Sequence, residues 1–400
     1  MTTARLERLA RAALVALAVA FVFTLAAGSG SSTASGRVGG DYPAFYGAGT
    51  IVADGNGHDL YDIEPGGAQD VSQRDLYGGE SGFLYYVYPP PVAAFYAPLA
   101  KLPYRLSYAV DTFLMIGALL GALLLVRPMV RVAREHLLLT FTACLLFYPM
   151  LRAVSSGQNT SITLLLLAGL WRAEHEDRDV LGGIALGLLL LKPQLGLLVV
   201  VLLLVRRRWR PVAVAAAVGV ALFAASVAIS GTSWLGDWWH VLRTYEHGDT
   251  ILNAHQSIAW MGAAESVLGV GSTAAKLIGY PLAIASVAGA VWVWCCTRAT
   301  EEGAALRWSI AAAAVLLASP HTVFYDAGLV VLAGMVLADR ATTSRDRNLL
   351  VAGFLVAYLN VISEAIWVTP VLATVVLAYV LVFKAARGTA HPEGRAASDA

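Results

Sequence analysis

The sequence predicts an all-α polytopic membrane protein, and three observations lead to this class. Hydrophobic residues make up 58% of the 400 residues, whereas charged residues make up only 14%. The mean hydropathy is +0.65. Apolar runs recur along almost the whole chain, with short charged clusters between them. This composition excludes an ordinary soluble globular domain, and the formal net charge of +1 gives no indication of nucleic-acid binding.

The apolar runs predict about twelve transmembrane helices. Several runs are shorter than the ~20 residues that span a bilayer, so neighbouring helices must shelter them or flanking helix must extend them. Arg5, Arg8 and Arg11 precede the first run, which fits a signal peptide as well as an anchor. We expect an uncleaved first helix, because the topology requires it. The expected helices are 10–28, 109–126, 137–151, 160–171, 180–191, 194–205, 212–230, 274–296, 308–319, 324–338, 349–363 and 367–383.

The distribution of cationic residues predicts the topology. Lys192-Pro193 either splits two short helices or kinks one long helix. With a split, most of the 28 Lys and Arg residues fall on one side of the membrane. A single kinked helix would place neighbouring cationic clusters on opposite faces. The positive-inside rule therefore favours the split, in a multi-pass protein of the plasma membrane with both termini in the cytoplasm.

A single integral-membrane domain is expected over residues 1–384. It carries two long extracytoplasmic loops, 29–108 and 231–273, and a polar tail, 385–400, is expected to be disordered in the cytoplasm. The first loop begins with a Gly/Ser tether and then becomes rich in aromatic residues, which predicts short helices lying at the membrane interface. Within it, Tyr88-Pro89-Pro90-Pro91 predicts a rigid extended break between two such helices.

Polar residues that are able to bind ligands or take part in catalysis gather at the outer ends of the predicted helices. Polar groups are costly in lipid, so they tend to be paired or functional. Cations can neutralise phosphate, amides and tyrosines can bind hydroxyls, and a carboxylate can act as a base. The set fits a site for an anionic lipid headgroup and a hydroxyl-rich sugar. Its members are Asp41, Tyr42, Arg152, Gln158, Asn159, Lys192, Gln194, His255, Gln256, His321, Tyr325 and Asp326.

Each of these residues also has a structural interpretation. Arg152 and Lys192 could extend toward the interface as isolated cations. Gln158 and Asn159 could cap the helix that follows them. His321 could pair with Asp326, and Asp41 could be a solvated surface acid. The functional interpretation gains weight because all of these groups are predicted on the same side of the membrane.

The order and spacing of several short motifs resemble glycosyltransferase family 87, whose members have the GT-C fold. The resemblance runs from Asp41 to about Asp326. Each motif is weak alone, and together they form a fairly specific pattern. The motifs are Asp41-Tyr42, Tyr88-Pro89-Pro90, Gly157-Gln158-Asn159, Leu191-Lys192-Pro193, Gln256-Ser257, and Ser319-Pro320-His321 with Tyr325-Asp326.

The resemblance implies an inverting transferase that moves a hexose, mannose in α linkage, from a polyprenyl-phosphate donor to a cell-envelope glycolipid or polysaccharide. The catalytic residues would be Asp41, as the base, and His321. Lys192, His321 and Arg152 would neutralise the leaving phosphate, and the other polar residues of the set would bind substrate. The reaction would occur outside the cytoplasm, at the lipid bilayer. No cofactor or nucleic-acid partner is expected, and no metal is expected because no Asp-x-Asp pair lies near Asp41.

Two alternatives remain at this stage. The transferred sugar could be arabinofuranose or glucose, because a few hydrogen bonds decide which hydroxyl stereochemistry is accepted. The same polar groups could instead bind a lipid-linked glycan without reacting, as in a transporter. A transporter is expected to carry ionisable residues near the bilayer midplane and often paired halves, and the sequence shows neither.

Overall fold

The structure, a computed structural model, describes residues 2–27, 38–77 and 83–390 of the chain. Within these ranges the regular elements are α-helices and 3₁₀-helices, joined by turns and by one isolated antiparallel β-bridge between Ser257 and Val323. The prediction of an all-α protein is therefore confirmed.

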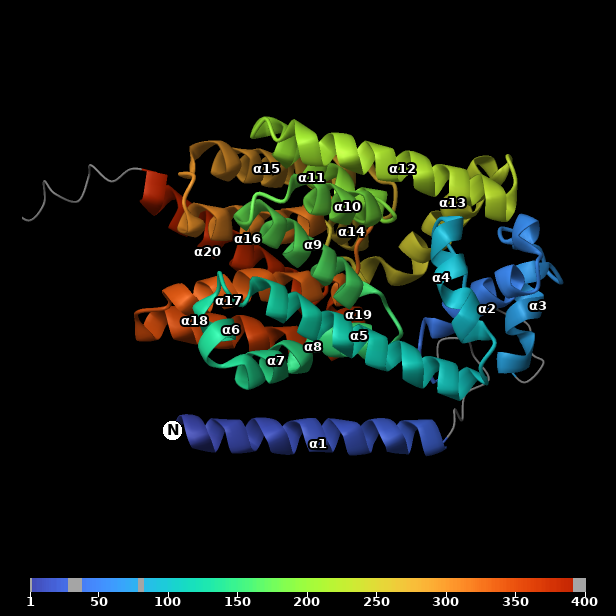
Figure 1. Ribbon diagram of the computed structural model, residues 1–400, viewed down its shortest axis with the longest axis horizontal. Coiled ribbons are helices and arrows are strands. Elements are labelled where there is room, and N and C mark those ends of the chain that lie inside the picture. Colours follow the sequence, from blue (N-terminus) through green and yellow to red (C-terminus); the bar gives the residue numbers. More distant parts are fainter. Residues whose placement is uncertain (1, 28–37, 78–82, 391–400) are drawn as a thin grey trace, which may run out of the picture.

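Six helical segments are long and apolar enough to cross a membrane, and they indicate a multi-pass membrane protein. A seventh is possible if α7 (Leu137–Leu146) and α8 (Tyr148–Ser155), which are bent by 74° at Phe147, form one broken span. In Figure 1, α1, α12 and α15 run along the long axis of the molecule. The six are α1 (Thr3–Ala27), α5 (Tyr104–Val126), α12 (Trp209–Ser230), α15 (Thr273–Cys296), α18 (Ser344–Val356) continued through η6 (Ala357–Ile362) and α19 (Ser363–Ile366), and α20 (Pro370–Ala390).

The expectation of about twelve spans is not supported. All twelve apolar runs are helical, but the remaining ones form helices that are too short, or too charged in the case of α16 (Glu301–Ala318), to pass as spans. An apolar run signals burial, and a helix can be buried among other helices as well as in lipid. The shorter helices are α9 (Thr160–His175), α10 (Asp179–Leu189), α11 (Pro193–Val205), η5 (Phe324–Val330) and α17 (Val331–Arg340).

The predicted helix break at Lys192-Pro193 is confirmed. The helix α10 ends at Leu189 and α11 begins at Pro193, whose fixed φ and missing N–H suit the first turn of a helix. Helix ends elsewhere also follow local chemistry. The hydroxyl of Thr300 accepts a hydrogen bond from Gly303 at the start of α16, and Thr343 and Asp346 form a capping box at the start of α18.

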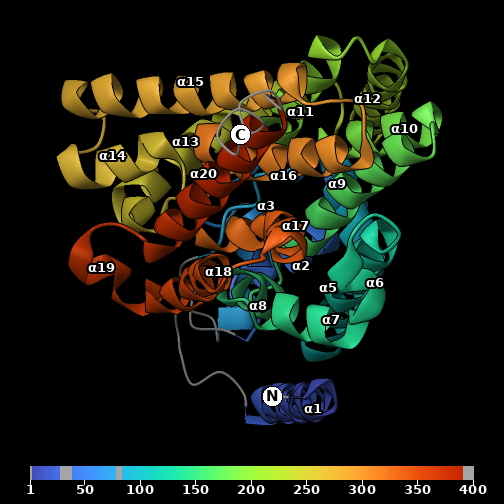
Figure 2. The ribbon, with the colours of Figure 1, turned by 90° about the vertical axis from the view of Figure 1, so that its left-hand side faces the viewer.

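The bundle packs around α16. Its residues from Leu306 to Leu317 are all almost completely buried. The helices α11, α15, α17 and α20 pack around it. In contrast, α1 lies at the edge of the molecule, and most of its apolar residues are not buried by the rest of the protein (Figures 1 and 2). The part of α16 from Ser309 to Ala318 carries no charged residue, and a helical segment that is apolar on every side is expected at the centre of such a bundle.

Short helices fill the predicted first loop, as expected, and their depth relative to a membrane stays a prediction. They are α2 (Tyr42–Ala53), α3 (Ala68–Arg74) and α4 (Pro90–Ala100), with the 3₁₀-helices η2 (Gly57–Asp59) and η3 (Asp75–Tyr77). Together with α13 (Trp234–Asn253) they gather at one end of the molecule (Figure 1). The expected extended break at Tyr88–Pro91 is wrong in part, because Pro90 and Pro91 form the first turn of α4.

A buried aromatic cluster holds this end of the molecule together. The ring centroids of Phe45 and Tyr96 are 4.9 Å apart, and those of Phe45 and Tyr88 are 5.2 Å apart. Trp238 of α13 donates a hydrogen bond of 2.9 Å from Nε1 to the carbonyl oxygen of Val87. Aromatic pairs of this kind stabilise a core beyond the area that they bury. The cluster comprises Tyr42, Phe45, Leu60, Tyr61, Tyr86, Tyr96, Tyr108 and Trp234, among others.

Three further expectations concern the second predicted loop, the C-terminal tail and the Gly/Ser tether. The second predicted loop contains α13, η4 (Ala254–Gln256) and α14 (Trp260–Leu268). The tail expected to be disordered from residue 385 is helical as far as Ala390, the last residue of α20. Residues 391–400 and the Gly/Ser tether at 28–37 lie outside the described residues.

One short helix, α6 (Arg131–Glu135), links α5 to α7.

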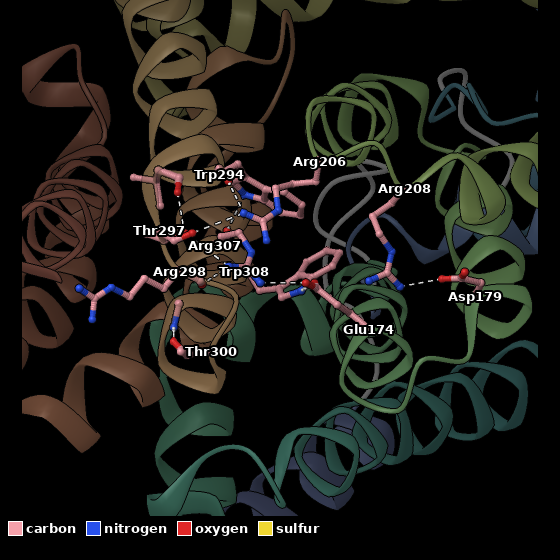
Figure 3. A network of polar contacts seen from close by, with 12 residues as sticks. Glu174, Asp179, Arg206, Arg208, Trp294, Thr297, Arg298, Thr300, Arg307 and Trp308 are labelled. Carbon is pink, nitrogen blue, oxygen red and sulfur yellow. Dashed lines mark hydrogen bonds and ion pairs between the residues drawn. The ribbon is translucent and has the colours of Figure 1, made fainter. Parts of the chain in front are cut away.

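Polar contacts join five helices at their ends (Figure 3). Arg307 of α16 is almost fully buried and forms an ion pair of 2.9 Å with Glu174 of α9. The indole Nε1 of Trp308 donates to the second oxygen of Glu174 at 2.6 Å. Nearby, Trp294 of α15 donates to the carbonyl oxygen of Arg307 at 3.0 Å. Arg208 at the start of α12 pairs with Asp179 at 2.6 Å. Glu174 thus connects α9 to two residues of α16, and Trp294 connects α15 to the same helix.

We predict that Glu174→Gln destabilises the bundle, because it leaves the guanidinium of Arg307 buried without a counter-charge. Loss of one partner of a buried ion pair costs about 3 kcal/mol or more. The midpoint of thermal unfolding in detergent should fall. Glu302→Gln is the matched control, since Glu302 pairs with Arg340 at the exposed surface. Such pairs contribute under about 1 kcal/mol. Equal midpoints for the two variants would contradict the prediction.

Candidate active site

The Asp41 turn docks onto the end of α8. Gly39 and Gly40 have φ values of +92° and +51°, which side chains rarely tolerate, and Asp41 is the residue before α2. The N–H of Asp41 donates to the carbonyl oxygen of Ser156 at 3.0 Å. A Cβ at Gly157 would lie 2.6 Å from Cβ of Tyr42. Glycines on both sides therefore allow two backbones distant in sequence to touch.

Gln158 connects Asp41 to the other side of the site. Its Nε2 donates to Oδ2 of Asp41 at 2.8 Å and approaches the hydroxyl of Tyr325 at 3.2 Å. Its Oε1 is buried and has no hydrogen-bond partner among the described residues. Buried polar atoms are usually satisfied, so this oxygen is suited to accept a hydrogen bond from a bound hydroxyl. The sequence prediction that Asp41, Gln158 and Tyr325 share one site is consistent with these contacts.

Lys192 and Asp326 form a buried ion pair beside Tyr88. The Lys192 ammonium lies 3.4 Å from Oδ1 of Asp326 and 5.7 Å from the centroid of the Tyr88 ring. The second oxygen of Asp326 accepts from the N–H of Val323 at 3.2 Å. The structure thus gives Asp326 a lysine as its cationic partner, where the sequence had suggested His321. Because Asp326 neutralises its charge, Lys192 attracts an anionic ligand less strongly than an unpaired lysine would.

Asn159 is the residue before α9, but its side chain does not cap the helix. The side chain instead interacts with Tyr88, and its Oδ1 is buried without a hydrogen-bond partner in the described structure. Two neighbouring amides, Gln158 and Asn159, therefore each present an unused acceptor oxygen. This arrangement suits hydroxyl groups better than carboxylates or phosphates, which would be repelled by the two acceptors.

His321 lies in the segment between α16 and η5. Its ring meets that of Tyr245 edge to face, with centroids 5.7 Å apart. The N–H of Ile258 donates to the carbonyl oxygen of Thr322 at 3.0 Å, and this bond fastens the segment to the chain after η4. The histidine is half-buried and borders a cavity, so a ligand can reach it.

The remaining predicted residues lie around this group. Gln256 bonds to His255 at 2.9 Å and accepts from Asn360 at 3.2 Å, so its contacts lead toward η6. Tyr42 is completely buried, with its hydroxyl 2.6 Å from Oγ of Ser107. Because it directly follows Asp41, it anchors the Asp41 turn in the core. The side chain of Arg152 is exposed on α8, and Gln194 is half-buried in the first turn of α11.

The sequence interpretation missed two aromatic contacts. Tyr88 was expected as an interfacial ring, yet it touches Lys192 and Asn159. Tyr245, in the second predicted loop, packs on His321. Aromatic content marked the first loop, but no sequence signal shows which ring lies over which polar group.

Burial governs the protonation of the tyrosines. It raises the pKa of Tyr325 well above its usual value, and the nearby Asp41 carboxylate acts in the same direction. Burial also raises the pKa of Tyr88. Both phenols therefore stay neutral and can hydrogen-bond to hydroxyl groups. A carboxylate, in contrast, can accept a proton, and Asp41 is the one that Gln158 orients.

We predict that Gly157→Ala disrupts the Asp41 turn. The new Cβ would meet Tyr42, and φ at this position is +68°, so the strain costs about 1–3 kcal/mol. The midpoint of thermal unfolding should fall. Gly219→Ala in α12 serves as the control, because a Cβ there meets no atom within 4 Å. A variant at Gly157 as stable as this control would show that the contact is looser than described.

Comparison with known families matches residues 86–320, more than half of the chain, to the family described as Glycosyltransferase family 87. Asp41 and His321 lie outside the matched residues. Comparisons with curated proteins and with solved structures gave no significant match. The geometry above is compatible with this result, because a carboxylate lies beside neutral side chains whose chemistry allows hydrogen bonds to hydroxyl groups. The chain belongs to glycosyltransferase family 87.

Proposed function

We propose that the protein is an inverting glycosyltransferase that takes a hexose, mannose, from a polyprenyl-phosphate donor. Membership in the family implies transfer of a sugar from a donor to an acceptor. The observation that carries the proposal is the Asp41 carboxylate, held by Gln158 next to two unused acceptor oxygens, Gln158 Oε1 and Asn159 Oδ1. The product is α-linked mannose on a cell-envelope glycolipid or polysaccharide.

The step proposed here is a single displacement. An acceptor hydroxyl gives its proton to Asp41 as its oxygen forms a bond to the anomeric carbon. The bond between that carbon and the phosphate oxygen breaks, and the electron pair leaves with the polyprenyl phosphate. One base suffices because the attack occurs opposite the leaving group, which inverts the anomeric carbon, whereas a retaining glycosidase needs two carboxyl groups. Help from such a base amounts to roughly 10²–10⁴-fold.

The phosphate leaving group needs charge neutralisation, not a proton donor. His321 is proposed to contact this phosphate from the segment before η5. Lys192 adds positive charge to the same region, but its ion pair with Asp326 suggests that it mainly holds η5 and Tyr325 in position. The amides of Gln158 and Asn159, with Tyr325, are proposed to bind sugar hydroxyls.

The cellular setting is proposed from the sequence and the apolar helices. A multi-pass protein of the plasma membrane, with both termini in the cytoplasm, would carry Asp41 on the outer side. Nucleotide sugars are cytoplasmic, so a lipid-linked donor that diffuses in the bilayer suits a site on that side. The GT-C fold is part of the same proposal.

We predict that Asp41→Asn lowers the rate of sugar transfer by about 10²–10⁴-fold, because asparagine keeps the size and hydrogen bonding of aspartate but cannot take the proton. The assay uses purified full-length protein, polyprenyl-phosphate-mannose and a membrane glycolipid extract. Asp54→Asn is the matched control, since Asp54 is exposed at the end of the same helix.

Different outcomes of this assay separate the alternatives. Unchanged activity in Asp41→Asn would assign the base to another residue. Activity of the parent with a polyprenyl-phosphate-linked arabinose or glucose, but not with the mannose donor, would overturn the choice of sugar. A parent protein inert with all of these donors would favour a lipid-linked glycan transporter instead.

We also predict that transfer proceeds without a divalent metal, because a phosphate leaving group can be stabilised by the cations of the chain. Initial rates of the parent protein with and without EDTA test this expectation. A rate that EDTA abolishes and that Mg²⁺ or Mn²⁺ restores would contradict it.

A further inference from the structure

A cavity of about 490 Å³ lies next to the proposed site, between α13, α14, α15 and the segment that contains His321. Figure 2 shows α14 alongside α15, with α13 beside them. The contact between α14 and α15 is close, because a Cβ at Gly279 would lie 2.8 Å from Cα of Met261. The cavity wall is therefore formed by two helices in tight contact.

Two cations and one acid line this cavity, together with neutral polar side chains. Arg243, Lys276 and His321 line it, and its acidic residue, Glu265, accepts a hydrogen bond of 3.0 Å from the N–H of Gly271. The guanidinium of Arg243 lies 4.9 Å from the centroid of the Trp239 ring. Neither Arg243 nor Lys276 forms an ion pair with any residue that the structure describes. Both cations are thus available to an anionic ligand.

Apolar residues also line the cavity, and α15, which forms part of its wall, carries exposed apolar residues. Met261, Val270 and Tyr280 contribute to its walls. Further along α15, Leu277 and Ile284 are 70% and 67% exposed. A free phosphate would use the cations but not this surface, whereas a lipid phosphate would use both.

We propose that Arg243 and Lys276 bind the phosphate of the lipid donor, whose hydrocarbon chain lies along the exposed face of α14 and α15. This assignment rests on the proposed function and names the part of the chain that recognises its lipid substrate. An acceptor lipid could carry a phosphate too, so the test below distinguishes the two lipids.

The position of the cavity supports its assignment to the donor lipid. His321 borders the cavity, and Tyr325, four residues later, meets Gln158, which holds Asp41. A sugar next to Tyr325 would therefore have the base on one side and the cations on the other. Attack opposite the leaving phosphate requires this arrangement. The pairing of Lys192 with Asp326 leaves Arg243 and Lys276 as the cations without a carboxylate partner near this segment.

The direct test measures binding of farnesyl phosphate, and of the uncharged alcohol farnesol, to detergent-solubilised full-length protein. The double variant Arg243→Gln/Lys276→Gln should bind farnesyl phosphate about tenfold more weakly, since two charge-assisted contacts are lost. Farnesol binding should not change. The control Lys384→Gln/Arg387→Gln removes two exposed cations near the end of α20 and should bind both probes like the parent.

Three results would overturn the proposal. They are equal affinity of the cavity variant and the parent for farnesyl phosphate, equal weakening in the control, and inorganic phosphate binding as tightly as farnesyl phosphate. In the transfer assay, farnesyl phosphate should compete with the lipid donor, and the cavity variant should raise the KM for that donor. Competition with the acceptor alone would assign the cavity to the acceptor lipid and refute the donor assignment.

Failure of this inference is distinguishable from failure of the proposed function. A parent that transfers sugar, with an unchanged donor KM in the cavity variant, refutes only the cavity assignment. A parent that binds farnesyl phosphate through Arg243 and Lys276 but transfers no sugar refutes the transferase mechanism and keeps the binding site.

Discussion

The contact between the Asp41 turn and the end of α8 is the constraint on which the rest of the site depends. The hydrogen bond from Gln158 to Asp41 joins residues 117 positions apart. It forms because Gly40 and Gly157 leave room for two backbones to meet. Since Gln158 also reaches Tyr325, this one side chain brings the first loop, the start of α9 and η5 into a single site.

Aromatic packing holds one end of the molecule together, and an ionic network holds the other end. Near the site, aromatic rings fill the space among α2, α4 and α13, and Trp238 of this region donates a hydrogen bond to the carbonyl oxygen of Val87. The network of Glu174 and Arg307 instead joins helix ends through ions and indoles. Buried ion pairs add less stability than their charge suggests, because desolvation opposes them, but they leave little freedom in how helices align.

Charge near the site is divided between two roles. Lys192 is neutralised by Asp326 and lies against Tyr88, which suits a residue that holds others in place. Arg243 and Lys276 line an open cavity and have no such partner in the described residues. The low dielectric of a buried site makes an unpaired cation costly, whereas water can solvate one at the mouth of a cavity. Exposure therefore accounts for which cations remain available.

The sequence by itself determined the all-α class, the approximate positions of the apolar runs that form helices and the break at Lys192-Pro193, and it supplied the candidate polar residues of the site. These features are local, since apolar runs, prolines and caps act within a few residues. It overestimated the number of spans, because apolar residues bury equally well in lipid and in protein. Only the tertiary structure decided that Gln158 holds Asp41, that Lys192 is paired with Asp326 and that Arg243 lines a cavity. Such contacts depend on how helices distant in sequence pack together, and no spacing along the chain records them.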